Sequence, residues 1–359
     1  MSGCNIRTIS SFNELDSIKS HWLELESKDK QSSVFQSWQW NRTWCEQVLV
    51  KNSSACLHVQ VVEDGEGAVV AILPFFITAL VGPLLKITQF LGHRMSVRNN
   101  ILIADHDNQA LVDEVIKLML GSLGRNNLLH LRHLPGDSLF TKTLHNKKLA
   151  KPQCKNLYIG SDLAVTDQLT RLGKASQKTL RKHRRRLEKN YDCKITVSSS
   201  ETVAKAFDDW FYLHEQRFKS KNRQSVITSD NLKFLKTAVL SLAAEDNVEI
   251  LSLHADDKVV GSQVLVNDGV RCFTYQCGFD PEFARYSPLK ILMVETLRRA
   301  FDELNCEVVD FGPGYEPYKY EWSPDVGLNY SCCVGGKGIY IKTLAGLYRY
   351  AFHKRLPAI

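Results

Sequence analysis

The stretch RCFTYQCGFDPEFARYSPLKILMVETLRRAFDELNCEVVDFGPGYEPYKYEW, residues 271–322, decides the fold. Its first segment, 271–277, is aromatic and alternating and stops at a glycine, which predicts a β-strand. A helix is predicted next, because Ser287 suits the N-cap and Pro288 suits the first helical position. A second strand, 308–311, then opens into a Gly-Pro-Gly turn. This is a strand-helix-strand unit, and open α/β sheets bind ligands at the loops that follow such strands.

The charges at the start of this predicted helix are informative. A helix N-terminus carries partial positive charge and normally attracts Asp or Glu. Here the sequence has Arg285 and Lys290 instead. An anion bound between these cations and the free backbone N–H groups would explain them. Two solvated side chains are the alternative interpretation.

The order of strand, GFDPEFARYSP, helix, DFGPG and YKYEW resembles the catalytic half of a known family. These are the GNAT-type acyltransferases grouped with CelD and the BioF2-like acetyltransferase domain, two-domain relatives of the FemABX peptidyl transferases. The resemblance implies an α/β fold of the α+β type with a mixed sheet, built from tandem GNAT-like domains. It also implies that a pantetheine thioester lies along the first strand, with its pyrophosphate at the helix start.

Carried over to this sequence, the resemblance implies acyl-CoA contacts at Tyr275, Gly278, Arg285, Ser287 and Lys290. On the acceptor side it implies contacts at Tyr318, Lys319 and Trp322. The chain departs from the family at Leu289, where glycine is usual, and a side chain there limits how closely a pyrophosphate approaches the backbone. His214 and Arg217 share a face of a predicted helix, 201–219. The resembled family has residues lining the acceptor pocket at this place, and a structural histidine is the alternative.

Direct attack of an amine on a thioester needs a base, donors to the carbonyl oxygen and a proton for the leaving thiolate. The candidate bases are Asp310, Glu316 and His214, and the candidate proton donors are Tyr275 and Tyr286. Spacing does not choose among them. Asp310 has an alternative role in capping the turn that follows it. Lys319 has two interpretations, as a ligand for an acidic acceptor or sugar phosphate and as a plain surface lysine.

The length of 359 residues, with 44% hydrophobic and 24% charged residues, suggests two globular domains. We expect a degenerate GNAT-like domain over residues 1–165, a catalytic GNAT-like domain over 166–340 and a basic amphipathic tail helix over 341–359. Hairpins are predicted around the turns at 63–67 and 255–258. Trp38, Trp40 and Trp44 are expected to pack an N-terminal helix onto a sheet, with sugar or base binding as the alternative.

The net charge of +7 comes from one short segment of the sequence. Residues 171–189 hold nine Lys or Arg and one acid, so the remaining 37 basic and 38 acidic residues net −1. This pattern predicts a helix with a broad cationic surface. The open interpretations are binding of RNA, attraction of the phosphates of coenzyme A or of a nucleotide-linked acceptor, contact with an anionic lipid surface, and plain solvation. We favour steering of an anionic substrate.

Ten cysteines without a CxxC pair, and histidines without zinc spacing, predict reduced thiols in a cytoplasmic protein and no metal site. The N-terminus has no apolar segment typical of a secretion signal. Ala68 to Leu85 is an uncharged run of 18 residues, but Pro74 and Gly82-Pro83 interrupt it. We expect a buried strand, 68–73, and then irregular apolar chain. Shallow association with the inner face of a membrane stays open.

The leading functional hypothesis is an N-acyltransferase that moves an acyl group, acetyl first, from acyl-CoA to an amine acceptor. The resemblance implies an envelope or exopolysaccharide (cellulose-like) precursor as the acceptor. One alternative is a FemABX-like transferase that takes its donor from aminoacyl-tRNA, which the basic helix and Leu289 also suit. Another is a non-catalytic GNAT-fold binding protein in a polysaccharide synthesis complex. The acyl chain length and the oligomeric state cannot be read from the sequence.

Overall fold

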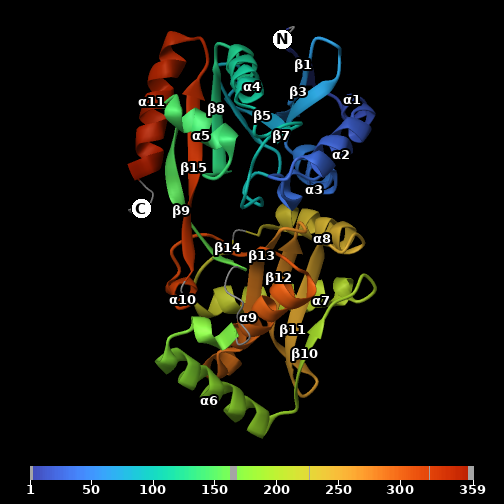
Figure 1. Cartoon of the computed structure of the whole chain (residues 1–359), viewed down its shortest axis with the longest axis vertical. Coiled ribbons are helices and arrows are strands. Elements are labelled where there is room, and N and C mark those ends of the chain that lie inside the picture. Colours follow the sequence, from blue (N-terminus) through green and yellow to red (C-terminus); the bar gives the residue numbers. More distant parts are fainter. Residues whose placement is uncertain (1–2, 162–167, 226, 323, 355–359) are drawn as a thin grey trace. The chain divides into compact units, whose positions relative to one another are not determined.

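The computed structural model describes residues 3–161, 168–225, 227–322 and 324–354 (Figure 1). The chain forms two compact units. Unit 1 comprises Met1–Lys155 and Gly327–Ile359, and unit 2 comprises Asn156–Val326. The domain boundary expected at residues 165 and 166 lies outside the described residues. The observed division also differs at the other end, because the chain returns to unit 1 at Gly327.

Unit 1 contains two groups of strands. One sheet has the order β1-β3-β4-β7, formed by β1 (Asn5–Ile9), β3 (Val59–Glu63), β4 (Val69–Leu73) and β7 (Leu102–Ile103). The other group has the order β15-β8-β6-β5-β2, formed by β15 (Asp325–Gly335), β8 (Asn127–Pro135), β6 (Leu85–Phe90), β5 (Phe75–Val81) and β2 (Ala55–Leu57). The helices are α1 (Phe12–Ser17), α2 (Lys19–Lys28), α3 (Trp38–Trp44), α4 (Gln109–Gly121), α5 (Leu139–Asn146) and α11 (Ile339–Lys354).

The uncharged run of unit 1 folds as strands. The buried strand expected at 68–73 is confirmed as β4, but the irregular chain expected after it is wrong, because Phe75–Val81 forms β5 and pairs with β6. Pro74 separates the two strands without ending the extended conformation, which suits proline's fixed φ. No helix in the described part of the chain is long and apolar enough to cross a membrane.

The packing role predicted for the tryptophan cluster is confirmed. Trp38, Trp40 and Trp44 are all buried. The Trp40 indole donates a hydrogen bond to Ser96 Oγ at 2.9 Å, and the Trp44 ring lies 4.8 Å from the Phe76 ring of β5. The cluster therefore fixes α3 against the strands of unit 1.

Unit 2 is a mixed sheet with helices. Its strands have the order β10-β11-β12-β13-β14-β9, formed by β10 (Cys193–Val197), β11 (Val248–Ala255), β12 (Lys258–Asn267), β13 (Arg271–Phe279), β14 (Val308–Pro313) and β9 (Ala150–Gly160). Its helices are α6 (Lys174–Asn190), α7 (Val203–Ser220), α8 (Ser229–Ala243), α9 (Pro288–Arg298) and the short α10 (Pro317–Tyr320). β13 and β14 are parallel, and the other pairings are antiparallel.

The predicted strand-helix-strand unit is confirmed as β13, α9 and β14. Between β13 and α9 the chain makes a short 3-10 turn, η4 (Pro281–Tyr286). Ile291, Leu292 and Leu297 of α9 are buried in the core of unit 2, as helical spacing requires. The predicted hairpins are confirmed as β3-β4 and β11-β12.

Candidate functional site

The parallel strands β13 and β14 separate soon after they begin. In the described structure they pair only from Arg271 to Phe273, opposite Val308 to Asp310. β13 then continues to Phe279 along β12, while the next ladder partner of β14 is Asn156 of β9, opposite Pro313. The edge of β13 beyond Phe273 therefore has no strand partner on this side. Such an edge presents backbone donors and acceptors that an extended ligand can use.

Tyr275 lies at an irregularity on this same strand. The register of β12 and β13 shifts here, because Val264 faces Gln276 while Leu265 faces Thr274. Tyr275 is thus the extra residue of a β-bulge, and bulges commonly re-aim side chains beside active sites. Burial raises the pKa of the Tyr275 phenol, which keeps it protonated at neutral pH.

Asp310 is a buried carboxylate with strong local contacts. Its Oδ1 accepts a hydrogen bond from the Gly312 backbone N–H at 2.6 Å. Its Oδ2 accepts from Asn156 Nδ2 at 2.8 Å. Gly312 has a positive φ of 71°, so the carboxylate fixes a turn that glycine favours. The capping role is observed, and a role as base stays a prediction.

His214, Arg217 and Cys277 meet where α7 packs on β13. His214 Nε2 lies 2.8 Å from Ser225 Oγ and its Nδ1 lies 3.4 Å from the Cys277 carbonyl oxygen. Arg217 Nη1 donates to the same carbonyl at 3.2 Å and contacts Cys277 Sγ at 3.0 Å. Burial lowers the pKa of His214, although the Cys277 carbonyl opposes this, so the ring is neutral at physiological pH.

Gly278 has a packing reason for being glycine. A Cβ at this position would lie 2.4 Å from the backbone N of His214, so α7 approaches β13 this closely only because there is no side chain. A contact between Gly278 and a cofactor stays a prediction.

Tyr318 of α10 belongs to the same neighbourhood. Burial raises the pKa of its phenol well above 10, with Cys277 and Glu316 adding to the shift and Arg217 opposing it. Tyr318 is therefore a neutral phenol at physiological pH and holds a proton, although the raised pKa makes it a weaker acid than an ordinary tyrosine. Cys277 was not singled out in the sequence, because a lone cysteine in a strand gives no signal.

Other residues expected on the acceptor side have structural contacts. Lys319 is buried and its Nζ donates to the carbonyls of Gly312 and Pro313, each at 3.2 Å. It also forms an ion pair with Glu316 at 2.9 Å. Trp322 is fully buried in the core of unit 2. These contacts tie α10 to the turn after β14 and favour structural roles for both side chains.

At the N-terminus of α9, the side chain of the N-cap residue makes no capping hydrogen bond. Ser287 is the N-cap residue, but it has a φ of 55° and its side chain does not cap the helix. Its Oγ lies 3.0 Å from His183 Nδ1 on α6. Tyr286 is buried, and its hydroxyl lies 3.4 Å from Asn190 Nδ2. The predicted N-cap position of Ser287 is confirmed, but its side chain bonds to the basic helix and does not cap α9.

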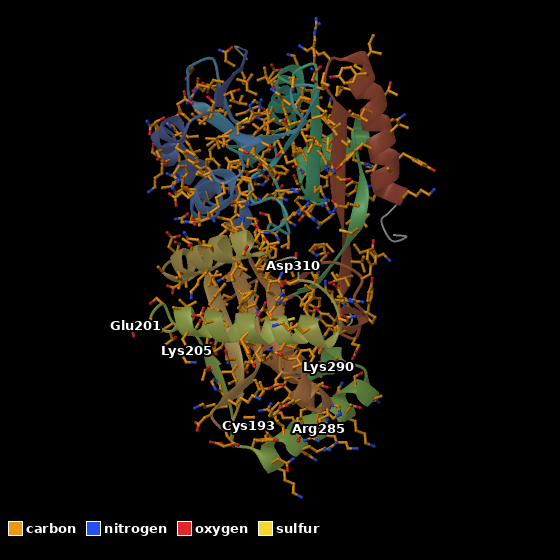
Figure 2. The ribbon with its side chains drawn as sticks, turned by 180° about the vertical axis from the view of Figure 1, so that it is seen from behind. Cys193, Glu201, Lys205, Arg285, Lys290 and Asp310 are labelled. Carbon is orange, nitrogen blue, oxygen red and sulfur yellow. The ribbon has the colours of Figure 1, made fainter. Side chains whose placement is uncertain are left out.

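The two cations at the start of α9, Arg285 and Lys290, differ in their exposure and in their contacts. Arg285 is exposed and its guanidinium lies 4.9 Å from the Tyr286 ring centre. Lys290 forms an ion pair with Glu321 at 2.6 Å. Burial, with Arg186, Lys182 and Lys290 nearby, lowers the pKa of His183. Basic residues of α6 and α9 therefore place positive charge around His183. The ion pair with Glu321 neutralises part of the charge of Lys290. Figure 2 shows Asp310 well apart from Arg285, with Lys290 between them.

Clefts in the described structure lie beside α6. One of about 270 Å³ is lined by residues of α6, β10, β11 and α9, among them Cys193, Lys194 and Ile291. Burial raises the pKa of Cys193, with Glu188, Asp192 and Asp256 adding to it, so its thiol is protonated.

All ten cysteines are free thiols. No group of three or more His, Cys, Asp or Glu among the described residues is placed to hold a metal ion.

Comparison with known proteins identifies the fold. Residues 174–320 match the family model described as an acetyltransferase (GNAT) domain. A crystal structure of FemX is similar with a TM-score of 0.65 at 9% identity, covering 97% of this chain and 100% of that chain. No curated protein matches the sequence.

Lysylphosphatidylglycerol synthetases show the same fold. The C-terminal domain of a putative one from Agrobacterium fabrum has a TM-score of 0.56 at 12% identity, covering 95% of this chain and 100% of that one. L-PGS from Bacillus licheniformis has a TM-score of 0.52 at 8% identity, covering 91% and 100%. The chain thus has a mixed α/β, GNAT acyltransferase-like fold with FemX-like structural neighbours.

Proposed function

We propose that this chain transfers an acyl group from acyl-CoA, acetyl-CoA first, to an amine acceptor. The match of residues 174–320 to the acetyltransferase (GNAT) domain supports the reaction class. The observation that carries the proposal is the separation of β13 from β14 after Phe273. The amide groups of a pantetheine arm can pair with this edge of β13 much as an added strand would.

The phosphates of the donor would lie at the start of α9. Free N–H groups at a helix N-terminus favour anions, and exposed Arg285 adds charge at this end. Lys182, on α6, contributes to the positive field that lowers the pKa of His183. Arg285 and the start of α9 lie on the loop and helix that directly follow β13, which is where an extended donor along that strand would continue.

The reaction needs only groups already found here. The acceptor nitrogen attacks the thioester carbon, the C–N bond forms, and the C–S bond breaks to release the CoA thiolate. The bulge at Tyr275 offers irregular backbone near the reacting carbonyl. The neutral Tyr318 phenol is our candidate for returning a proton to the thiolate, with Asp310, Glu316 and His214 as candidate bases. We propose an amino sugar of an envelope or exopolysaccharide precursor as acceptor, on the CelD-like resemblance.

Ligand-induced stabilisation tests the donor. The unfolding midpoint is measured with acetyl-CoA, a long-chain acyl-CoA and free CoA at moderate salt. A ligand at ~100 times its dissociation constant stabilises the fold by about 2.7 kcal/mol. We expect a clear upward shift that falls by more than half in Lys182→Gln/Arg285→Gln. Lys205→Gln on α7 is the matched control, because this exposed lysine is paired with Asp209 away from the α9 start (Figure 2).

Lys290 is not used in this test for a structural reason. Its replacement would leave Glu321 unpaired and would alter the local charge indirectly. A shift with CoA ligands that survives in Lys182→Gln/Arg285→Gln would locate the donor elsewhere. The absence of any shift with all three ligands would contradict acyl-CoA dependence.

A FemABX-like transferase with an aminoacyl-tRNA donor is the second candidate. The Lys290–Glu321 ion pair favours it, because it leaves the helix start with less free charge for a pyrophosphate. Leu289 also favours this candidate, because a side chain at this position limits how closely a pyrophosphate approaches the backbone. This candidate expects no shift with CoA ligands, together with salt-sensitive binding of tRNA that weakens when the α6 cations are replaced. Binding without turnover of either donor would favour the non-catalytic alternative.

A further inference from the structure

An exposed apolar patch lies on unit 1, apart from the residues discussed above. Helix α11 packs Ile341, Ala345 and Tyr348 inward, against a small core that includes Ile87 and Leu128. Its outward face carries large apolar side chains beside the exposed Lys342 and Thr343, with Ile339 86%, Leu347 62% and Tyr350 68% exposed. A cluster of large exposed apolar side chains marks a surface that is normally covered. The outer face of α11 therefore needs an occupant.

The tip of the β5-β6 hairpin extends this surface. Leu80, Val81 and Leu84 are exposed there. The Tyr340 hydroxyl of α11 donates a hydrogen bond to the Leu84 carbonyl at 2.6 Å, so the hairpin tip and the start of α11 lie together. We call the exposed side chains the apolar patch, which consists of Leu80, Val81, Leu84, Ile339, Tyr340, Leu347 and Tyr350.

The charges near the apolar patch have one sign. Residues 67–104, 115–136 and 327–354, the described segments that form this edge, contain no Asp or Glu. Backbone hydrogen bonds from Gly338 to Arg125 and from Lys86 to Asn126 bring these segments together. Lys86, Arg125, Lys337 and Lys342 are exposed beside the patch. Apolar side chains framed by unopposed cations are the pattern by which proteins bind the interface of an anionic bilayer.

We propose that this face of unit 1 binds the surface of an anionic membrane, with the apolar patch inserted between the lipids and the lysines at the headgroups. Charge decides against the other occupants. A second copy of the chain in a two-fold contact would place the same cations against each other. A nucleic acid would satisfy the cations but would leave exposed leucine and isoleucine side chains uncovered. The proposal does not depend on the proposed function, because it uses no residue of unit 2.

Vesicle sedimentation of the full chain tests this proposal. The vesicles are phosphatidylcholine alone and an equimolar mixture of phosphatidylcholine and phosphatidylglycerol. We expect binding to the anionic vesicles that falls at high salt, and at least tenfold weaker binding to the neutral ones. In Lys86→Gln/Lys337→Gln/Lys342→Gln, partitioning should fall on the order of 100-fold, since each cation near the surface contributes roughly fivefold.

A second variant and two controls separate the contributions. Leu84→Gln/Ile339→Gln/Leu347→Gln should lose binding even at low salt, whereas Val50→Gln, an exposed apolar residue elsewhere in unit 1, should not. Lys178→Gln/Arg185→Gln/Lys189→Gln removes the same number of charges from α6 and should change binding by less than about threefold. Unchanged unfolding midpoints show that each variant is folded.

Several results would overturn the proposal. One is equal binding to neutral and anionic vesicles, or none to either. Another is loss of binding on replacing the α6 cations while the patch variants bind normally. A third is a dimer, seen by sedimentation velocity without lipid, that the leucine and isoleucine replacements convert to monomer, because the patch would then be a subunit interface.

Discussion

Asp310 shows how a candidate catalytic residue and a turn-fixing residue are distinguished. Its two oxygens accept from Gly312 N–H and Asn156 Nδ2. We expect Asp310→Ala to lower the free energy of unfolding by about 2 kcal/mol, because both buried donors lose their acceptor. Asp310→Asn keeps one carbonyl acceptor and should cost less, while the rate of acetyl transfer from acetyl-CoA to an amine stays within about tenfold. Urea denaturation and turnover measured on the same samples check this.

The opposite pattern would assign Asp310 to the chemistry. If Asp310→Asn kept its stability but lost turnover by 10²-fold or more, which is the range typical of a missing general base, the turn-fixing role would be secondary. Asn156→Ala is the matched control. It removes the 2.8 Å contact without touching the carboxylate, so it should affect stability more than turnover.

Lys319 and Trp322 show a limit of sequence reasoning at this scale. Both lie in the YKYEW motif and were predicted to line the acceptor side. Lys319 donates to two carbonyls of the turn after β14, and Trp322 fills the core, while a contact of either with an acceptor stays a prediction. A motif gives residue types in order, but the direction in which each side chain points depends on packing partners elsewhere in the chain.

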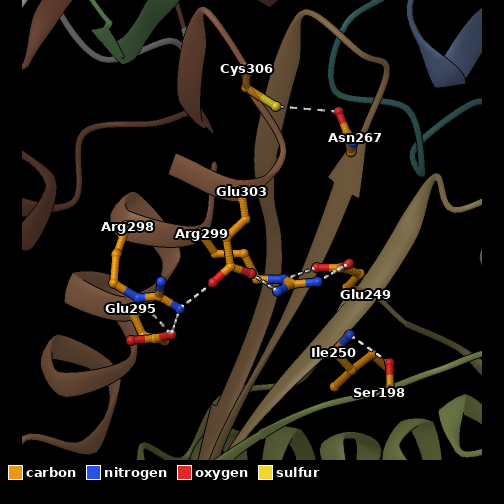
Figure 3. A network of polar contacts seen from close by, with 9 residues as sticks. All are labelled: Ser198, Glu249, Ile250, Asn267, Glu295, Arg298, Arg299, Glu303 and Cys306. Atoms are coloured by element: carbon orange, nitrogen blue, oxygen red, sulfur yellow. Dashed lines mark hydrogen bonds and ion pairs between the residues drawn. The ribbon is translucent and has the colours of Figure 1, made fainter. Parts of the chain in front are cut away.

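At the scale of elements, an ion-pair network joins the end of α9 to the sheet (Figure 3). Arg299 Nη2 donates to Glu249 Oε1 of β11 at 2.5 Å, and Arg299 also pairs with Glu303. The Arg299 and Glu249 side chains are only 19% and 15% exposed. We expect Arg299→Ala to lower the free energy of unfolding by about 2–3 kcal/mol, because Glu249 is left without its partner in a mostly buried place.

A double-mutant cycle with Glu249→Ala measures this coupling. The double variant should be less destabilised than the sum of the two single variants, by roughly 1 kcal/mol or more. Arg298→Ala is the comparison at the neighbouring position, since Arg298 is 44% exposed and its pairs with Glu295 and Glu303 should each contribute under about 1 kcal/mol. Additive single effects at Arg299 and Glu249 would contradict the network as drawn.

The elements of unit 2 were largely predictable, because their signals are local. The alternation of β13, the proline at the start of α9 and the basic pattern of α6 each depend on neighbours a few residues away. What was missed depends on distant partners. Ser287 bonds to His183, and Lys290 pairs with Glu321, and neither pairing leaves a mark in the sequence. The strand β5 was missed because an unbroken apolar run has no period.

At the scale of the whole molecule, the path of the chain was the hardest feature to predict. The segment from Gly327 returns to unit 1, where β15 pairs with β8. The tail helix expected at 341–359 is observed as α11 from Ile339 to Lys354, and its remaining residues lie outside the described part of the chain. The composition of a segment shows whether it is apolar or basic. It does not show which of the two cores a strand near the C-terminus, such as β15, will join.

Two half-buried histidines that stay neutral in the folded state make the stability of the molecule depend on pH. Burial, with Arg132, His93 and His130 nearby, lowers the pKa of His133 to about 3, and burial with Arg132 and Arg94 lowers that of His93 to about 4. An unfolded histidine takes up a proton near pH 6.5, whereas these folded ones do not. The unfolded chain therefore binds more protons below pH 6.5, so stability is fully present above that pH and is lost as the pH falls toward 4.

Each of these histidines should lower the free energy of unfolding by roughly 1 kcal/mol per pH unit as the pH falls from 6.5 toward 4. His133→Asn tests it, because asparagine tolerates the positive φ of 56° at this position and the backbone N–H can still donate to Gln153. Urea denaturation at neutral pH and about one unit below pH 6.5 should show a shallower loss in this variant. An equal slope in His133→Asn and the parent chain would mean that His133 is protonated in the folded state.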